Sequence, residues 1–448
     1  MNAVIVAVLV MIILSLSRIH VVLALLIGAV AGGLTAGFSV TETISIFSEG
    51  LGDNAQIALS YGLLGAFAIA ISFTGLPELM VKLAIKLVGK EGESRRSSLK
   101  KALILFVIAI IASFSQNLVP VHIAFIPLLI PPLLKVFNEL AMDRRAAATA
   151  LTFGLKAPYI LIPAGYGLIF HETIADNMEA SGLQIALNDI PGAMALPVLG
   201  MVVGLFISIL ITYKNPRTYE DKDLAQGEES SPQAPESPMG IFVGLTAILS
   251  VLAAQVSTDS MIIGAGTGLI ILYIYFSYLH ITRKFTLQEA DELMTRGMKM
   301  LAFIGFVMIT AGGFAEVIRE TGHVELLVES TEVWFNDRMG LAAIAMLLIG
   351  LFITMGIGSS FATVPILAAI FVPLAASLGF SPLATIALIG TAGALGDAGS
   401  PASDSTLGPT AGLNADGQHN HIWDTVVPTF LHFNIPLLIF GWIAAMIL

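Results

Sequence analysis

Long apolar segments alternate with short polar ones along the whole chain, from Ala3 to Leu448. In each half of the sequence, two apolar segments of helical length come first and a third follows. We expect these helices at 3–16, 20–37 and 57–75 in the first half, and at 239–256, 261–281 and 299–316 in the second. Segments of this length and apolarity are typical of transmembrane helices. The pattern therefore predicts an all-α polytopic membrane protein.

Each half continues with two shorter apolar pieces around a polar break. The first break is Ser113-Phe114-Ser115-Gln116-Asn117, and the second is Gly356-Ile357-Gly358-Ser359-Ser360. As helices, pieces of about 12–17 residues cover about 18–25 Å, whereas the hydrocarbon core of a bilayer is about 30 Å thick. We therefore expect re-entrant hairpins at 101–134 and 342–378. Helices broken by glycine and proline are expected at 149–172 and 383–410, and closing helices at 192–213 and 426–447.

Three landmarks recur in the same order in both halves. Thr74-Gly75-Leu76-Pro77-Glu78 resembles Thr321-Gly322-His323-Val324-Glu325, the two polar breaks precede prolines, and Pro163-Ala164-Gly165 matches Pro401-Ala402-Ser403. Five crossings plus a hairpin make an odd number, so the second copy must be inverted. We predict two inverted repeats, 1–213 and 239–448, joined by a cytoplasmic linker at 214–238 that is rich in Glu, Ser and Pro.

Composition supports a membrane location. Apolar residues make up 56% of the 448 residues and charged residues 12%, and the mean hydropathy is +0.88. Soluble domains carry about 25% charged residues. The net charge of −11 argues against a nucleic-acid partner, and the absence of cysteine excludes disulfides and thiolate metal sites. We expect a bacterial inner-membrane protein whose partners are lipid and a small ion or amino-acid substrate.

Basic residues set the predicted orientation. With 90–101, 136–146 and 214–238 in the cytoplasm, and 173–191 and 318–338 in the periplasm, nearly all Lys and Arg residues face the cytoplasm. The exceptions are Arg319, Arg338 and Lys156, which falls within the membrane. The segment from Leu76 to Lys90 has one apolar and one charged face, and this predicts an interfacial helix.

Polar breaks inside a membrane leave backbone groups unpaired, and such groups are tolerated only within protein or along a wet cavity. Freed carbonyls and hydroxyls suit Na⁺, and helix N-termini suit carboxylates. We expect a first site at Ser113, Ser115, Gln116, Asn117, Lys156, Pro163 and Gly165, and a second at Ser359, Ser360, Thr363, Asp397, Ser400, Ser403 and Asp404. The Na⁺ ligand candidates are Ser115, Asn117, Ser360, Thr363 and Asp404. The alternative is that small residues here only let helices pack closely.

Three ionisable residues lie at membrane depth, where charges are costly and usually functional. Asp397 is the candidate proton carrier, and Asp404 accompanies it. Alternatively, a carboxylate could cap the second half-helix, which suits Asp404 better than Asp397. Lys156 could pair with Asp397, bind an anionic substrate, or extend to the interface.

The histidines give weaker signals. His122 is a candidate proton relay or a packing residue, and His171-Glu172 lacks the second histidine of a zinc-protease helix. His419, His421 and Asp424 could bind a metal, but we expect them to be solvated loop residues. No enzyme motif is evident, which disfavours a membrane-embedded hydrolase, and no cofactor is expected apart from Na⁺ or H⁺ as coupling ions.

The pairing of hairpins and broken helices resembles the ion transporter superfamily. The run from Gly396 to Thr410, Gly-Asp-Ala-Gly-Ser-Pro-Ala-Ser-Asp-Ser-Thr-Leu-Gly-Pro-Thr, with Gly412 to His419 after it, resembles the bacterial Na⁺/H⁺ antiporter (NhaC-like) family. It is most similar to the branch labelled as amino-acid or histidine transporters. The resemblance implies an elevator-type mechanism and a homodimer.

These observations favour a cation-coupled secondary transporter, with Na⁺/H⁺ antiport first and Na⁺- or H⁺-coupled amino-acid transport second. A passive channel is disfavoured because inverted broken helices suit alternating access.

Overall fold

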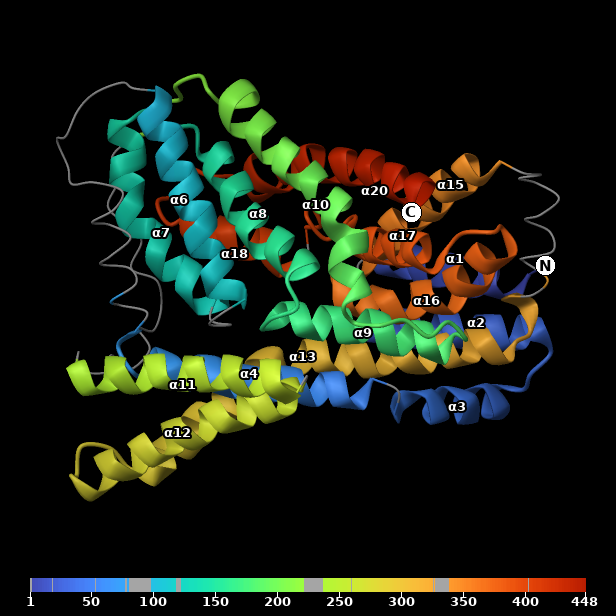
Figure 1. Cartoon of the computed structure of the whole chain (residues 1–448), viewed down its shortest axis with the longest axis horizontal. Coiled ribbons are helices and arrows are strands. Elements are labelled where there is room, and N and C mark those ends of the chain that lie inside the picture. Colours follow the sequence, from blue (N-terminus) through green and yellow to red (C-terminus); the bar gives the residue numbers. More distant parts are fainter. Residues whose placement is uncertain are drawn as a thin grey trace.

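The computed structural model (Figure 1) describes the chain apart from residues 1, 18, 53, 77–78, 80–97, 118–121, 221–236, 259, 325, 327–337 and 402. The part described is helical, with no strand in it. The first half contains α1 (Ala3–Leu16), α2 (Val21–Ala36), α3 (Val40–Glu49), α4 (Ala55–Ser72), α6 (Ser98–Asn117), α7 (His122–Glu139), α8 (Arg144–Leu161), α9 (Tyr166–Ala180) and α10 (Asp189–Ile207), which a π-helical turn, Ser208–Thr212, extends.

The second half contains α11 (Pro238–Thr258), α12 (Met261–Ile281), α13 (Leu287–Glu320), α15 (Met339–Ile357), α16 (Ser360–Ser377), α17 (Pro382–Ala394) and α18 (Asp404–Leu413). The chain closes with two π-helical segments, His421–Val426 and Phe430–Asn434, on either side of the short α19 (Val427–Thr429), and then α20 (Ile435–Ile447).

Five helical segments of the described part are long and apolar enough to cross a membrane: Asp189–Thr212, Pro238–Gln255, Met261–Ile281, Ser360–Ser377 and His421–Ile447. The bent pair α8 and α9 adds a sixth if it counts as one span. The outer helices α11 and α12 bury only a third of their most apolar windows, whereas α16 buries 83%. The chain is a multi-pass membrane protein in which α16 lies in the interior and α11 and α12 offer apolar faces to lipid.

The two halves share local structure at a constant spacing. Ser39 with Glu42 and Thr286 with Glu289 both form capping boxes, at the starts of α3 and α13, 247 residues apart. At the same spacing, Thr74 and Thr321 donate their hydroxyls to the backbone three residues earlier, and Gly75 and Gly322 both have positive φ. These matches favour two copies of one plan, and the inversion of the second copy stays a prediction.

Several expected bounds need correction. Helix α3 lies where we expected no helix, and α13 begins twelve residues before the predicted 299 because its capping box starts it at Leu287. The break expected at 113–117 is helical, since α6 runs through it as a helix of 20 residues. With α15 at 19 residues, these helices are about 30 Å long. The length argument for re-entrant hairpins therefore fails, and the hairpins themselves stay a prediction.

The other breaks lie where the sequence predicts them. Gly358, at φ +76°, and Ser359 separate α15 from α16, and α8 and α9 meet at an angle of 49° around residues 162–165. Residues 395–403 separate α17 from α18. Most of the predicted interfacial helix at 76–90 and residues 221–236 of the predicted linker lie outside the described residues.

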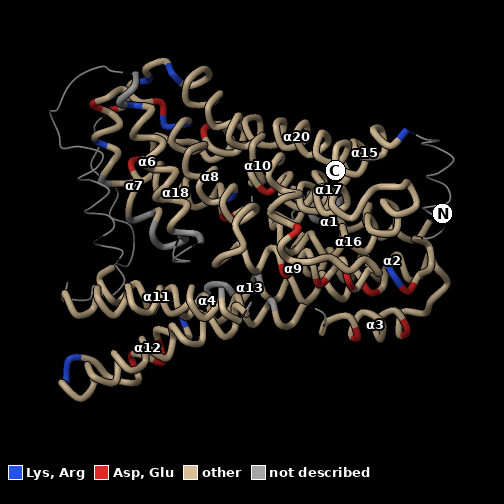
Figure 2. Tube along the Cα trace, in the orientation of Figure 1, with Lys and Arg blue, Asp and Glu red and all other residues tan. Residues whose placement is uncertain are grey.

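α4 packs along α13, where a Cβ at Gly297 or Gly305 would meet the backbone of α4. α8, α9, α16, α17 and α18 form the densely buried region that carries the polar breaks. In Figure 2 most basic segments gather at the left end of the long axis, as expected for one cytoplasmic end.

The absence of native cysteine allows the predicted orientation to be tested by labelling. Ala186→Cys lies in the exposed segment between α9 and α10, and Lys284→Cys lies in the exposed turn between α12 and α13. An impermeant maleimide added to intact cells should label Ala186→Cys, and should label Lys284→Cys only after the membrane is opened. Labelling in the reverse order would show that the predicted orientation is wrong.

Candidate functional site

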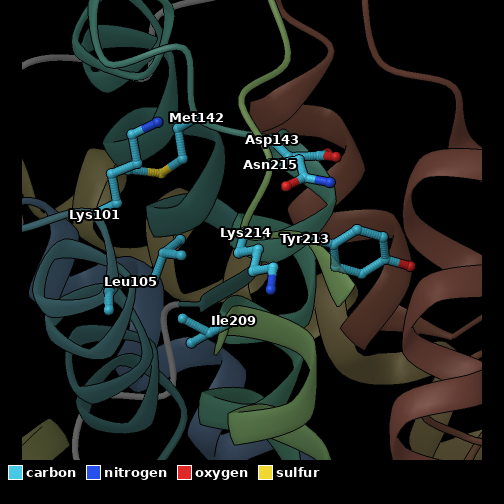
Figure 3. Close-up of a pocket in the computed structure, with 9 residues that line it drawn as sticks. Lys101, Leu105, Met142, Asp143, Ile209, Tyr213, Lys214 and Asn215 are labelled. Atoms are coloured by element: carbon cyan, nitrogen blue, oxygen red, sulfur yellow. The ribbon is translucent and has the colours of Figure 1, made fainter. Parts of the chain in front are cut away.

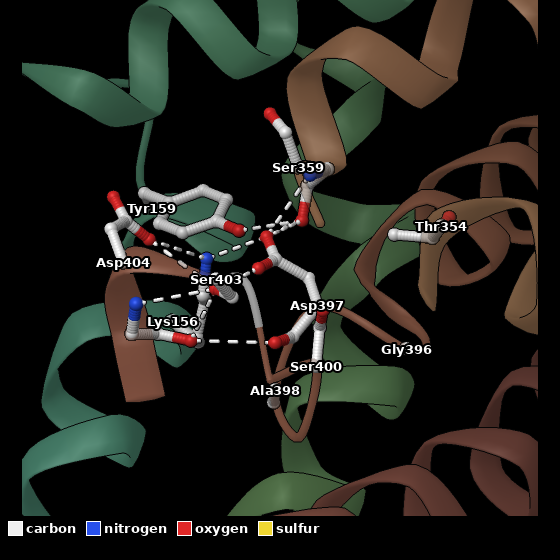
Figure 4. A network of polar contacts seen from close by, with 12 residues as sticks. Lys156, Tyr159, Thr354, Ser359, Gly396, Asp397, Ala398, Ser400, Ser403 and Asp404 are labelled. Carbon is white, nitrogen blue, oxygen red and sulfur yellow. Dashed lines mark hydrogen bonds and ion pairs between the residues drawn. The ribbon is translucent and has the colours of Figure 1, made fainter. Parts of the chain in front are cut away.

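Asp397 is the centre of a buried polar cluster between the broken helices (Figure 4). Its side chain is 1% exposed. The Lys156 ammonium donates to Asp397 Oδ2 at 2.5 Å, and the Ser360 backbone N–H and hydroxyl donate to the same oxygen at 3.0 and 2.5 Å. Ser403 donates its hydroxyl to Oδ1. One carboxylate thus receives four donors from three separate helical regions.

The backbone around Asp397 is non-helical because its glycines adopt conformations that other residues disfavour. Gly396 and Gly399 have φ of +83° and +119°. A Cβ at position 396 would lie 2.6 Å from the Leu351 carbonyl oxygen, so only glycine fits without a shift. This turn stops α17 at Ala394 and brings the Asp397 carboxylate toward the start of α16.

Helix starts supply further polarity. Ser359 caps α16 and accepts from the Ala362 N–H at 3.5 Å, so the Ser360 N–H belongs to the positive end of α16. Ser403, and not Asp404, caps α18, accepting from the Ser405 N–H at 3.2 Å. The capping role considered for Asp404 is therefore wrong, because the side chain one residue earlier already fills it.

Lys156 joins the two halves of the chain. It comes from α8, is 4% exposed, and lies 3.5 Å from Asp404 Oδ1 as well as 2.5 Å from Asp397. The Asp404 side chain is 28% exposed. The Lys156 ammonium also lies 5.3 Å from the centre of the Tyr159 ring, and the Tyr159 hydroxyl is 2.9 Å from Ser360 Oγ. One cation therefore stands between two carboxylates, one enclosed and one partly open.

The other predicted residues take different positions. Thr363 donates to the Ser359 carbonyl at 2.6 Å, and Ser400 donates to the Met355 carbonyl at 3.3 Å, so both stabilise the backbone around the cluster. Ser113 donates to Ala109 within α6 at 2.8 Å. Pro163 and Gly165 form the bend between α8 and α9. Ser115, Gln116 and Asn117 are in the last turn of α6, and their side chains, like that of His122, lie outside the described part.

Two buried amides that the sequence reasoning missed hold the backbone breaks. Asn434 accepts from the Gly396 N–H and donates to the Ala398 carbonyl, both at 2.7 Å. Gln255 of α11 accepts from the Gly165 N–H at 3.0 Å and donates to its carbonyl at 3.3 Å. A lone amide in an apolar segment is itself a signal, because such a group needs a partner inside a membrane.

Five aromatic rings form one wall of the site. Tyr61, Tyr159, Tyr166 and Phe170 each lie 5.3–5.6 Å from the Phe361 ring centre. Phe361 directly follows Ser360, so the ring cluster is continuous with the polar one. His171, next to Phe170, contacts the Ile160 carbonyl at 3.0 Å across the bend. Through Tyr159, which lies against the Lys156 ammonium, these buried rings adjoin the ion pair.

A second charged cluster lies at the far end of α8. Arg144 is fully buried and binds both carboxylate oxygens of Asp416, at 2.7 and 2.5 Å. Burial acts to raise the pKa of Asp416, but its hydrogen bonds from Arg144 outweigh this, and the pKa lies below its usual value.

Our expectation that His419, His421 and Asp424 are solvated is wrong for two of them. His419 is 3% exposed, with Nε2 2.7 Å from the Thr425 hydroxyl, and Asp424 is buried and accepts from Arg217 at 2.8 Å. Burial lowers the pKa of His419 to about 4, so it stays neutral at physiological pH. Among the described residues, no three His, Cys, Asp or Glu side chains group as a metal site.

The Asn434 contacts predict a measurable loss of stability. Asn434→Leu would leave the Gly396 N–H and the Ala398 carbonyl without their partner, at a cost of about 1–3 kcal/mol for each buried group. We expect a clear fall in the thermal unfolding temperature of the purified protein. Asn188→Leu is a suitable control because Asn188 is exposed and makes no side-chain cap bond. Equal unfolding temperatures for both variants would remove the structural role assigned to Asn434.

Two solved structures share the fold of this chain. The YdaH transporter of Alcanivorax borkumensis matches with a TM-score of 0.58 and 16% identity, over 91% of this chain and 89% of that one. MtrF of Neisseria gonorrhoeae, described as one of a class of antimetabolite efflux pumps, matches with a TM-score of 0.57 and 17% identity, over 91% and 85%. At these identities the likeness shows the fold alone.

Sequence comparisons find relatives of much higher identity. A Bacillus subtilis (strain 168) protein named "Putative amino acid transporter YuiF" is 55% identical over the full length of both chains. An uncharacterized membrane protein of Vibrio parahaemolyticus is 50% identical, again over the whole of both chains. The family model described as "Na+/H+ antiporter family" matches residues 150–442, and a second, "Na+-H+ antiporter family", matches residues 2–88. The matched region includes every residue of the Asp397 cluster, and the chain belongs to the Na⁺/H⁺ antiporter family.

Proposed function

We propose that the chain is a cation-coupled secondary active transporter that exchanges Na⁺ for H⁺ by alternating access. The observation that carries this proposal is the buried contact of Lys156 with Asp397 at 2.5 Å, between two broken helices. A buried ion pair is retained at a cost in desolvation, and removing one partner leaves an uncompensated charge. Such a pair is therefore suited to a cycle in which one cation replaces another.

The exchange follows from competition for the same carboxylates. With Lys156 protonated, its ammonium occupies Asp397 and lies near Asp404. When that proton leaves, Na⁺ can take the place of the ammonium between the two carboxylates, and the charge within the membrane is conserved. Ser360 and Ser403 donate to Asp397 in the present state. Because a hydroxyl both donates and accepts, each could turn an oxygen lone pair toward the bound ion.

Asp404 provides the route by which an ion reaches this pair. Its side chain is 28% exposed, whereas those of Asp397 and Lys156 are 1% and 4% exposed. A hydrated ion could meet Asp404 first and lose water before it reaches Asp397. We further propose that the protein lies in a bacterial inner membrane as a homodimer, and that the broken helices move as an elevator-type unit.

Cation-coupled amino-acid transport is the second candidate. The name of the Bacillus subtilis relative favours it. In this case a substrate carboxylate would bind Lys156 in place of Asp397, and the substrate ammonium would bind the partly open Asp404. The aromatic wall around Phe361 would then contact the substrate side chain.

The exchange proposal predicts a specific effect of neutralising Asp397. In proteoliposomes, Asp397→Asn should reduce Na⁺-driven H⁺ flux by about 10-fold to 100-fold. This factor corresponds to the free energy of one hydrogen bond to a charged group. The pH dependence of the remaining flux should also change, because the Lys156 ammonium that gives up the proton would no longer face the Asp397 carboxylate. Asp291→Asn, which changes an exposed aspartate of α13, serves as the control. Wild-type flux and pH profile in a folded Asp397→Asn protein would contradict the proposal.

Replacement of Lys156 separates the two candidate functions. Purified wild type and Lys156→Gln would be compared in thermal shift assays with Na⁺, Li⁺, histidine and other amino acids. Exchange predicts that Na⁺ stabilises the wild type, that amino acids have no effect, and that the variant responds differently to Na⁺. An amino-acid stabilisation that disappears in Lys156→Gln but persists in the exposed control Lys299→Gln would reject pure exchange in favour of amino-acid transport.

A further inference from the structure

Tyr61 of α4 places a buried hydroxyl at the aromatic wall of the site. The residue is 0% exposed, and its hydroxyl oxygen makes no hydrogen bond within the described part of the chain. The hydroxyl of the preceding residue, Ser60, donates to the Gln56 carbonyl at 3.0 Å. A buried hydroxyl without a hydrogen bond is costly, and phenylalanine would fill nearly the same space without that cost. The Tyr61 oxygen therefore needs an explanation other than packing.

The position of the Tyr61 ring is fixed by its aromatic neighbours. Its centre lies 5.5 Å from that of Phe361 and 5.6 Å from that of Tyr166, and the rings of both pairs meet edge to face at 86°. Such contacts favour one orientation of the ring. The negative charges of Asp404 and Asp397 both act on the Tyr61 hydroxyl. The unpartnered oxygen of Tyr61 thus lies within electrostatic reach of both carboxylates of the site.

Tyr61 also comes from a different part of the fold than the charged residues of the site. Lys156 belongs to α8, Asp397 to the segment between α17 and α18, and Asp404 is the first residue of α18. α4 instead packs along α13 (Figure 1). A helix outside the group of broken helices therefore borders the site and adds a polar atom to it.

A polar cavity between α6 and the segment after α10 lies apart from this site (Figure 3). Its lining includes Lys101, Asp143 and Lys214 but not Tyr61, and it has room for about one water molecule. A water held there would not contact the Tyr61 hydroxyl. The partner that this hydroxyl lacks is therefore to be sought in what binds at the Asp397 site.

The proposed exchange has two states, and only one of them offers a partner to Tyr61. In the present state the Lys156 ammonium lies 2.5 Å from Asp397 and 3.5 Å from Asp404. In the other state Na⁺ replaces the ammonium. Hard cations bind several oxygen atoms at once, and a tyrosine hydroxyl has an acceptor oxygen. A group whose contacts are satisfied in only one of two states shifts the equilibrium toward that state.

We propose that the Tyr61 hydroxyl is a ligand of the transported Na⁺, which it binds in the state without the Lys156 ammonium. This inference rests on the proposed exchange function. Asp397 and Asp404 supply the negative charge, and Tyr61 supplies a neutral oxygen from the side of α4. Because this oxygen is neutral, it adds to the affinity for Na⁺ without adding a charge to the interior of the membrane protein.

Tyr61→Phe tests the proposal, because it removes the oxygen and keeps the ring. Purified full-length wild type and variant would be compared by thermal shift over a range of NaCl concentrations, with N-methyl-D-glucamine chloride holding the ionic strength constant. Without Na⁺, the variant should unfold at the wild-type temperature or above it, because an unsatisfied hydroxyl has been removed. The Na⁺ concentration for half-maximal stabilisation should rise about 10-fold, which corresponds to the loss of one ligand. In proteoliposomes, the half-saturating Na⁺ concentration for H⁺ flux should rise by a similar factor.

Tyr278→Phe is the control, because Tyr278 is 51% exposed on α12, and this variant should respond to Na⁺ as the wild type does. Unchanged Na⁺ dependence in Tyr61→Phe, beside a wild type that responds to Na⁺, would overturn this assignment and leave the exchange proposal standing. A lower unfolding temperature of Tyr61→Phe without Na⁺ would also overturn it, since the hydroxyl would then have a partner in the ion-free protein. A wild type that does not respond to Na⁺ would reject the exchange proposal and this assignment with it.

Discussion

The structure depends on the cost of placing the charges of Lys156 and Asp397 inside a membrane protein. An isolated buried charge is far more costly than a paired and hydrogen-bonded one. The surroundings of the pair lower this cost, because the Ser360 backbone N–H and hydroxyl and the Ser403 hydroxyl all donate hydrogen bonds to Asp397. The positive end of α16 adds to the same effect. The helix breaks are thus the means by which enough donors reach one carboxylate.

Those breaks create a second requirement, since each interrupts helical hydrogen bonds where water is scarce. Asn434 satisfies the N–H of Gly396 and the carbonyl of Ala398 in one break. Gln255 satisfies the N–H and the carbonyl of Gly165 in the other. Gln255 belongs to α11, a lipid-facing helix of the second half, whereas Gly165 belongs to the bend of the first half. The bend near Lys156 is therefore held partly by a helix outside the buried region.

The sequence predicts the features that a single segment encodes, and it fails where partners are distant. Polar and ionisable residues in apolar surroundings located the break at 395–403 and the group formed by Lys156, Asp397 and Asp404. Helix α3 was missed because its short amphipathic pattern is weak beside membrane segments. The prediction of a break at 113–117 was wrong because serine and asparagine near a helix end are equally compatible with a helix that stops before them and one that continues for another turn. Asn434 and Gln255 were missed because their partners lie 36–38 and 90 residues away.

The contacts between α8 and the α18 region limit how the protein can change shape. Arg144 binds Asp416 at one end of α8, Thr152 donates to the Ser405 carbonyl at 2.8 Å, and Lys156 lies 3.5 Å from Asp404. Arg144 and Lys156 are about 18 Å apart along the helix. Sliding α8 past α18 would break all three contacts and leave the buried Arg144 and Asp416 charges unpaired. A motion that exposes the site to the other side of the membrane should therefore move α8 and α18 together. The contacts that change would be those between this pair and the helices packed around it. Exchange of one cation for another at Asp397 would then need no separation of the two helices.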